Sequence, residues 1–346
     1  MNRQYKNIKI VLTIVIISLV ANLFPIFGKK LGNLSQVGIP AQIMVDNDQL
    51  YVTDQKIKIH LYSLKNFKYI KSFSNRGEGP GEFKVVPRLK IYPDYLFLYG
   101  FLKIMRVSRN LQYIDEFKTS KHFRYIYPVG SNYVGFSGGL NQKTEMYYSE
   151  ICIYTRDKDL KYKKLIYYLE NIPVVKPGQK EDSPMLSETH SFIVYKDRIY
   201  IGDPTRGLFV QVFDSNGNKL YQINLNYEKK KVTEEFKQEW MRERWPDLSR
   251  WEAYKKTCNP YFQDYFPPFL KFEVKNDKIY FFTYNRKGTD SEVIVTDLKG
   301  KILRKAYVPH SRNRSGFDFT VDNDKYYYIV DNEETEEWEL HAVDIK

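Results

Sequence analysis

The sequence predicts an all-β protein, a six-bladed β-propeller whose blades are four-stranded antiparallel sheets. Three observations lead to this fold class: six hairpin patterns along the chain, tight polar turns inside them, and an aromatic-rich composition. Aromatic residues make up 16% of the 346 residues, and aromatic side chains favour β-strands. Single β domains can reach this size, so one propeller can account for most of the chain.

Each hairpin pattern is a short apolar run, a polar turn and a second apolar run, as expected of a β-hairpin. In the first, residues 43–45 and 50–52 flank the polar triplet Asp46-Asn47-Asp48. The others occupy residues 89–98, 127–134, 192–201, 272–281 and 319–328. Several continue into a second hairpin, so the repeating unit is a four-stranded meander, as in a propeller blade. A pair of β-sandwich domains is the alternative all-β arrangement, but the repeated double hairpins favour the propeller.

The last blade is incomplete at the end of the chain. After the sixth hairpin, residues 338–344 supply only a third strand. We therefore expect a strand from Leu34 to Ile39 to complete this blade. Such a closure would join the two ends of the propeller and remove an exposed sheet edge.

The most distinctive stretch is Gly77-Glu78-Gly79-Pro80-Gly81-Glu82-Phe83, which lies between two predicted strands. Its three glycines permit backbone angles that other residues resist, and its proline fixes one φ angle. We expect a rigid link between two blades, with Phe83 docked into a core at its end.

Placed after the outer strand of a blade, this motif resembles the exported six-bladed β-propeller proteins related to NHL repeats. The resemblance covers residues 34–346, and the motif at residues 77–83 is its most specific part. It implies a propeller fold and a place in the bacterial cell envelope, and it implies no particular reaction.

The first 30 residues have the pattern of a targeting segment. Arg3, Lys6 and Lys9 precede an apolar run that begins at Ile10. A basic start before such a run is typical of a secretory signal peptide or of an uncleaved anchor helix. We expect residues 31–346 to form the propeller outside the cytoplasm, either in the periplasm or held at the membrane through residues 8–27. Whether the segment is cleaved stays open.

One insertion, residues 229–268, interrupts the hairpin pattern and is helical near residues 232–257. Thr233 can cap a first helix, which Pro246 ends. Ser249 and Glu252 have capping-box spacing for a second helix.

The insertion has two interpretations. As a lid over one propeller face, it would turn Trp240 and its other aromatic residues toward a ligand. As a packed element, it would bury them against the blades, which aromatic pairs at helical spacing more often do. A second long connection, from Asn171 to His190, could border the same face.

The chain lacks the spacings of common catalytic and metal sites. Its five histidines are far apart in sequence, and no zinc-protease or nucleophile-elbow motif occurs. Whether Cys152 and Cys258 pair is not decided by their positions. The triplets at residues 46–48 and 322–324 lack the later residues of a calcium loop, and turn chemistry explains them. No cofactor is predicted, although a divalent cation in the central channel stays open because loops converge there.

The net charge of +12 suits an acidic partner, but scattered bases can also serve solubility alone. RNA binding of the NHL type would suit the charge as well. The predicted export argues against it, so no nucleic-acid partner is expected.

Candidate ligand-binding residues lie on loops that a propeller would place around its funnel. They are His190, Asp203, Arg206, Arg312 and Arg314, to which Trp240 of the insertion is added. Together they could bind an anionic group through charge-assisted hydrogen bonds. The alternative is that they are solvated loop residues with local turn bonds.

Two function classes follow. The leading hypothesis is a non-enzymatic binding or scaffold module of the cell envelope that uses a propeller face for a protein, peptide or glycan ligand. The alternative is a propeller enzyme, a lyase or hydrolase acting on a sugar or lactone, with a metal in the channel. The missing catalytic motifs favour the first, although a fold alone does not determine function.

We expect the double substitution Arg206→Ala with Arg312→Ala to abolish binding of an acidic ligand and to leave the melting temperature unchanged, because exposed loop residues contribute little to stability. A thermal-shift panel of acidic and neutral glycans, envelope peptides and divalent metals on residues 31–346 provides the measurement. An unchanged affinity in the double variant would contradict the expectation.

Overall fold

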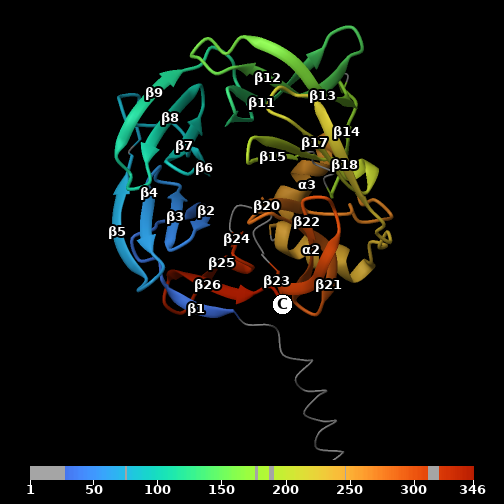
Figure 1. Cartoon of the computed structure of the whole chain (residues 1–346). Coiled ribbons are helices and arrows are strands. Elements are labelled where there is room, and N and C mark those ends of the chain that lie inside the picture. Colours follow the sequence, from blue (N-terminus) through green and yellow to red (C-terminus); the bar gives the residue numbers. More distant parts are fainter. Residues whose placement is uncertain (1–27, 75, 176–177, 187–190, 246, 311–318) are drawn as a thin grey trace, which may run out of the picture.

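The computed structural model describes residues 28–346 except residues 75, 176–177, 187–190, 246 and 311–318. It contains six four-stranded antiparallel sheets, which are arranged around a central axis like the blades of a propeller (Figure 1). The predicted all-β, six-bladed architecture is therefore confirmed. A two-stranded parallel sheet and two short helices are added to it.

The first five blades follow one another along the chain, each from its inner to its outer strand. Blade one contains β2 (Pro40–Asp46), β3 (Gln49–Asp54), β4 (Ile59–Ser63) and β5 (Lys68–Phe73). Blade two contains β6 (Arg88–Ile91), β7 (Tyr95–Gly100), β8 (Lys103–Ser108) and β9 (Tyr113–Lys118). Blade three contains β10 (Tyr125–Val129), β11 (Asn132–Asn141), β12 (Met146–Thr155) and β13 (Tyr162–Pro173). Blade four contains β15 (Ser191–Tyr195), β16 (Arg198–Gly202), β17 (Leu208–Phe213) and β18 (Lys219–Leu225). Blade five contains β20 (Lys271–Lys275), β21 (Lys278–Lys287), β22 (Asp290–Asp297) and β23 (Ile302–Pro309).

Blade six is assembled from both ends of the described chain. It contains β24 (Phe319–Asp322), β25 (Lys325–Asn332), β26 (Glu337–Asp344) and, as its outer strand, β1 (Lys29–Asn33). The closure is as expected, but the boundaries expected for the strand were wrong. Leu34 is fully buried, and it begins a turn in which its carbonyl accepts a hydrogen bond from the Val37 amide at 2.8 Å. Its apolar pattern therefore belongs to the core beneath the turn, and the pairing strand lies just before it.

The link between blades one and two depends on close contacts around its glycines. Gly81 has φ +78°, an angle that favours glycine. A Cβ atom on Gly77 would lie only 2.0 Å from the Glu82 carboxylate. Phe83 is 1% exposed and packs with Leu89 and its neighbours between the two blades. The expected docking of Phe83 is confirmed, and only one of the three glycines has a positive φ.

The insertion between blades four and five contains both predicted helices, α2 (Glu234–Arg244) and α3 (Leu248–Thr257). Thr233 caps α2, as expected. The cap of α3 is Asp247 rather than Ser249, because the Asp247 carboxylate accepts hydrogen bonds from the Ser249 amide and hydroxyl at 2.9 and 2.7 Å.

The insertion is joined to the connection that precedes blade four. After α3, β19 (Cys258–Tyr261) pairs in parallel with β14 (Glu181–Pro184). The two long connections therefore meet beside blade four, as Figure 1 shows.

The two faces of the disc differ in the length of their loops and in the elements added to them. Because neighbouring strands of a blade are antiparallel, the turns between its first and second strands and between its third and fourth lie at one end of the axis. We call this end the turn face. The connections between blades, and the loops between second and third strands, lie at the other end, which we call the inter-blade face. The long hairpins β11–β12 and β21–β22, the helices and the β14–β19 pair all belong to the inter-blade face.

The expected signal or anchor helix lies in residues 1–27, outside the described part of the chain. Within the part that is described, no helix combines the length and the hydropathy needed to cross a membrane.

We expect Phe83→Ala to lower the free energy of unfolding by about 3–5 kcal/mol, because it leaves a cavity between two blades. Val85→Ala is the matched control, since Val85 lies in the same link with 44% of its surface exposed. Urea denaturation of both variants measures the effect. Equal stabilities would show that the link does not depend on its docked aromatic ring.

Candidate functional site

The inner strands of the six blades present alternate residues to the central channel. The residues between them face the spaces between blades, which are filled with apolar side chains. Each inner strand is followed by a tight turn, so equivalent positions can be compared between blades. The middle layer consists of Met44, Lys90, Tyr127, Ile193, Glu273 and Thr320. All of these except Thr320 are partly exposed, which indicates that water reaches the channel.

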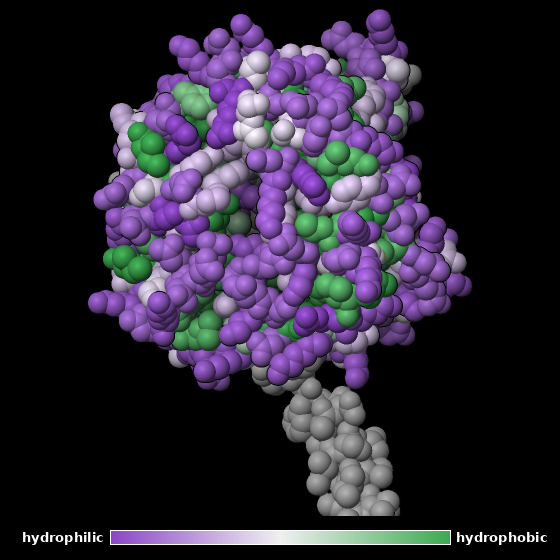
Figure 2. All heavy atoms as spheres, in the orientation of Figure 1, coloured by the Kyte–Doolittle hydropathy of each residue, from purple (hydrophilic) through white to green (hydrophobic). Residues whose placement is uncertain are grey.

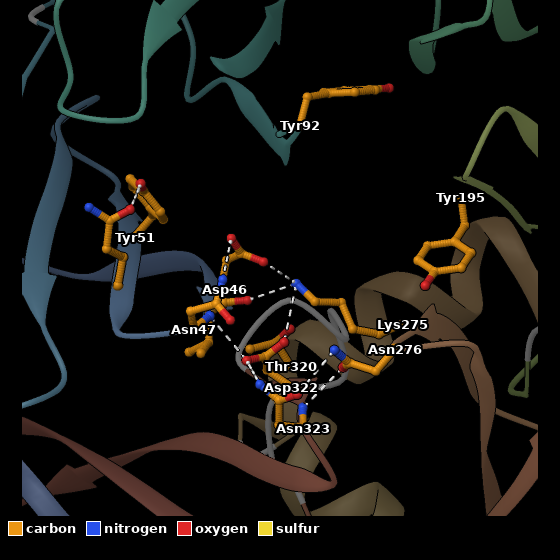
Figure 3. A network of polar contacts seen from close by, with 12 residues as sticks. Asp46, Asn47, Tyr51, Tyr92, Tyr195, Lys275, Asn276, Thr320, Asp322 and Asn323 are labelled. Carbon is orange, nitrogen blue, oxygen red and sulfur yellow. Dashed lines mark hydrogen bonds and ion pairs between the residues drawn. The ribbon is translucent and has the colours of Figure 1, made fainter. Parts of the chain in front are cut away.

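At the turn face, a polar network connects blades five, six and one, and a further contact adds blade two (Figure 3). The Lys275 ammonium donates to Asp46 Oδ1 at 3.1 Å and lies 3.5 Å from Asp322 Oδ1. It also donates to the Val45 carbonyl at 3.1 Å. Arg109 binds the other oxygen of Asp46 at 2.7 Å, which brings blade two into the network.

Paired turn residues extend this network. The Asn47 amide donates to Asp322 Oδ2 at 3.1 Å. The side-chain amide of Asn276 donates to Asn323 Oδ1 at 3.2 Å. In return, the backbone amide of Asn323 donates to Asn276 Oδ1 at 3.0 Å. Asn47 and Asn323 have φ angles of 53° and 49°, as asparagine in a tight turn tolerates. The interpretation of the two Asp-Asn-Asp triplets as turns is therefore confirmed.

The pKa values of the two carboxylates in the network are shifted in opposite directions. Burial disfavours the charge of Asp46, but the hydrogen bond from Arg109 and the charge of Lys275 outweigh it and lower the pKa of Asp46. Burial raises the pKa of Asp322, and the charge of Asp46 adds to this effect, whereas Lys275 opposes it. The ammonium of Lys275 occupies the point where both carboxylates converge. The network is therefore a structural junction that is already neutralised.

Two of the predicted site residues, Asp203 and Arg206, share the loop between β16 and β17 on the inter-blade face. Asp203 caps a short 3₁₀ turn, Pro204–Arg206, by accepting from the Thr205 amide at 3.1 Å. It also accepts from the Tyr167 hydroxyl at 3.3 Å and is nearly buried. Arg206 is exposed, and its guanidinium lies 3.5 Å from the centre of the Phe209 ring. Asp203 shapes the loop, while Arg206 is presented to solvent.

The other predicted residues divide into one that is described and three that are not. Trp240 is buried on α2, with its ring 5.4 Å from that of Phe262. On the same helix, Phe236 lies 4.6 Å from Phe266. These contacts pack the helix against its own insertion. His190, Arg312 and Arg314 lie outside the described residues.

Exposed large apolar side chains fall into two groups among the described residues. One group lies on the outer strands of the blades: Ile70, Tyr113, Ile114, Tyr162, Leu165, Tyr168, Leu220, Ile302 and Leu303. The other lies on elements of the inter-blade face: Ile39, Val85, Phe101, Leu140, Tyr147, Leu248, Tyr261, Tyr265 and Leu270. No residue of either group is in a turn of the turn face. In the view of Figure 2, apolar side chains form separate patches among hydrophilic ones.

Sequence reasoning missed the charged residues of the channel, above all Lys90 and Lys275. A signal was present, because Lys271, Glu273 and Lys275 alternate with apolar residues in a strand that begins a blade. In a strand with one face toward water, charges at alternate positions indicate the solvated side. That side of an inner strand is the channel.

No protein-family model and no curated protein matches the chain. Among solved structures, BamB from Moraxella catarrhalis has 11% sequence identity over 86% of this chain and 70% of that chain, with a TM-score of 0.29. The computationally designed Ika8 protein has 8% identity over 91% of this chain and 100% of that chain, with a TM-score of 0.40. Likenesses this weak carry no argument about function, and the fold assignment rests on the six sheets themselves.

We expect Lys275→Met to lower the free energy of unfolding by roughly 2–3 kcal/mol near pH 7.5, less than for a fully buried pair because Lys275 and Asp46 keep about one fifth of their surfaces exposed. The loss should shrink as the pH falls toward 3.8, because the pKa of Asp322 is already raised and the folded state takes up a proton there first.

Urea denaturation near pH 7.5 and near pH 5 measures this difference. Lys65→Met is the control, since Lys65 and its partner Asp48 are both mostly exposed, and it should change stability little at either pH. A loss for Lys275→Met that is independent of pH would contradict the junction described here.

Proposed function

We propose that the protein is a non-enzymatic binding module of the cell envelope, which binds an acidic protein, peptide or glycan on its inter-blade face. One observation carries the proposal: the long hairpins, both helices and the β14–β19 pair are built onto this face, while the turn face has only short turns. Elements that are not needed to complete the blades are where binding residues are commonly found.

Exposed apolar side chains support the same face. Leu140 and Tyr147 stand opposite each other in the β11–β12 hairpin and are 45% and 48% exposed. Cross-strand neighbours of this kind form one continuous contact surface. Large exposed aromatic and aliphatic residues are typical anchors of protein interfaces.

Charge supports an acidic ligand. The chain carries a net charge of +12, which attracts acidic partners over distance. Arg206 is exposed on the inter-blade face, and a guanidinium is suited to carboxylate and phosphate groups. The earlier prediction for Arg206 and Arg312 belongs to this face, although Arg312 lies outside the described residues.

The envelope location rests on the sequence. The basic start and the apolar run within residues 1–27 support export or attachment to a membrane. The enzyme hypothesis has no specific observation in its favour, and at the junction of Asp46 and Asp322 an ammonium stands where a metal would bind.

We expect Leu140→Glu with Tyr147→Glu to reduce cross-linking of the protein to its envelope partner at least tenfold, because the change removes apolar contact and repels an acidic ligand. The control is Ile70→Glu with Ile114→Glu, which introduces the same charge at residues that are exposed to a similar extent on outer strands. Cross-linking in intact envelopes, followed by quantification of the adduct, measures the effect.

Equal adduct in the face variant and the wild-type protein would overturn the assignment of this face. Loss of adduct in the outer-strand control alone would assign binding to the rim of the disc instead. Recovery of the full chain in the cytoplasmic fraction of the cells would overturn the envelope location.

A further inference from the structure

Lys90 is a channel cation that no neighbouring acid neutralises directly. Lys271 pairs with Glu273 at 2.6 Å, and Lys275 pairs with Asp46 and Asp322. Among the residues that the structure describes, the Lys90 ammonium has neither a hydrogen bond nor an ion pair. Lys90 is partly buried, and a partly buried charge without a partner in the protein is stabilised by a counter-charge from solution.

The surroundings of Lys90 come from both sides of the channel. Lys90 is on blade two, yet Lys271, Glu273 and Lys275 on blade five act on its charge. Burial lowers the pKa of Lys90 to about 8, with Lys275 adding to the effect and Glu273 opposing it. The amine is therefore still mostly protonated at neutral pH, and a bound anion would stabilise that charge.

Tyr127 provides a second donor in the same layer of the channel as Lys90, on the inner strand of the next blade. Lys90 lies two positions before Tyr92, and Tyr127 lies two positions before Val129; Tyr92 and Val129 each begin the tight turn of their blade. Burial raises the pKa of Tyr127, so its hydroxyl keeps its proton. Within the described part of the chain, this hydroxyl also has no hydrogen-bond partner.

We propose that Lys90 and Tyr127 form an anion-binding site midway along the channel, which takes a carboxylate or phosphate group of a small ligand. The ammonium and the phenol offer two donors to one oxyanion. Arg88 lies one layer toward the inter-blade face and Lys275 one layer toward the turn face, so an anion at this depth has cations on both sides. A metal cation does not fit, because the acids of the channel, Asp46, Asp322 and Glu273, are already bound to lysines.

The site does not depend on the partner-binding face proposed above. It lies inside the disc, and it is formed by inner strands rather than by the insertions. Leu140→Glu with Tyr147→Glu should leave anion binding unchanged, so the two proposals can fail separately.

The test is a thermal-shift titration of the purified protein with inorganic phosphate and with succinate, each compared with sodium chloride at the same ionic strength. We expect both anions to raise the melting temperature of the wild-type protein and of Lys68→Met, a control at an exposed lysine of an outer strand. Lys90→Met should remove the shift. Tyr127→Phe should weaken binding about tenfold, as expected for one hydrogen bond to a charged group.

A second measurement separates binding from stability. Without added anion, Lys90→Met should melt no lower than the wild-type protein, because it replaces a partly buried, unpaired charge with an apolar chain of similar length. Acetylation of Lys90, followed by mass spectrometry near pH 8, should be slowed by phosphate but not by chloride. A shift that persists in Lys90→Met, or acetylation of Lys90 that neither anion slows, would overturn the site.

Discussion

The pairing of β1 with β26 is the interaction on which the ring of blades depends. Without it, blade six would have three strands and an open edge. The pairing is reinforced by ionic contacts, since Lys30 binds Glu339 at 2.6 Å and His341 Nε2 lies 2.8 Å from the same carboxylate. The hydrogen bond from Lys30, followed by those from Asn332 and His341, lowers the pKa of Glu339 to about 2. This closure helps to hold the six inner strands around one axis.

Closure also explains how residues far apart in the sequence share a network. Asp46 meets Lys275 and Asp322 because blade one follows blade six around the ring. The turn face is thereby locked across its centre, and the inter-blade face is left to carry insertions. This division suits a module that needs a rigid base and a variable surface, as scaffolds with functional loops commonly have.

Most of the fold could be predicted from local sequence patterns. The contacts between segments that are far apart in the sequence could not. The hairpins were predictable because apolar runs and Asx-rich turns are local signals. The position of this strand, β1, was predicted wrongly because Lys29–Asn33 shows no apolar alternation. The stretch that begins at Leu34, just after it, contains more apolar residues. The parallel pair β14–β19 could not be expected from Glu181–Pro184, which has no apolar alternation and whose residues lie 77 positions from their partners. The channel charges were visible as alternation, but their partners depend on the order of blades around the ring.

The position of β1 determines the side of the disc at which the described chain begins. As the outer strand of its blade, β1 starts at the turn face and runs along the rim toward the inter-blade face. Gly28 therefore leaves the disc at the rim on the turn-face side, where its amide donates to the Tyr328 hydroxyl at 3.0 Å. Any attachment made through the preceding residues holds the molecule by that side. The helices and long hairpins then point away from the point of attachment.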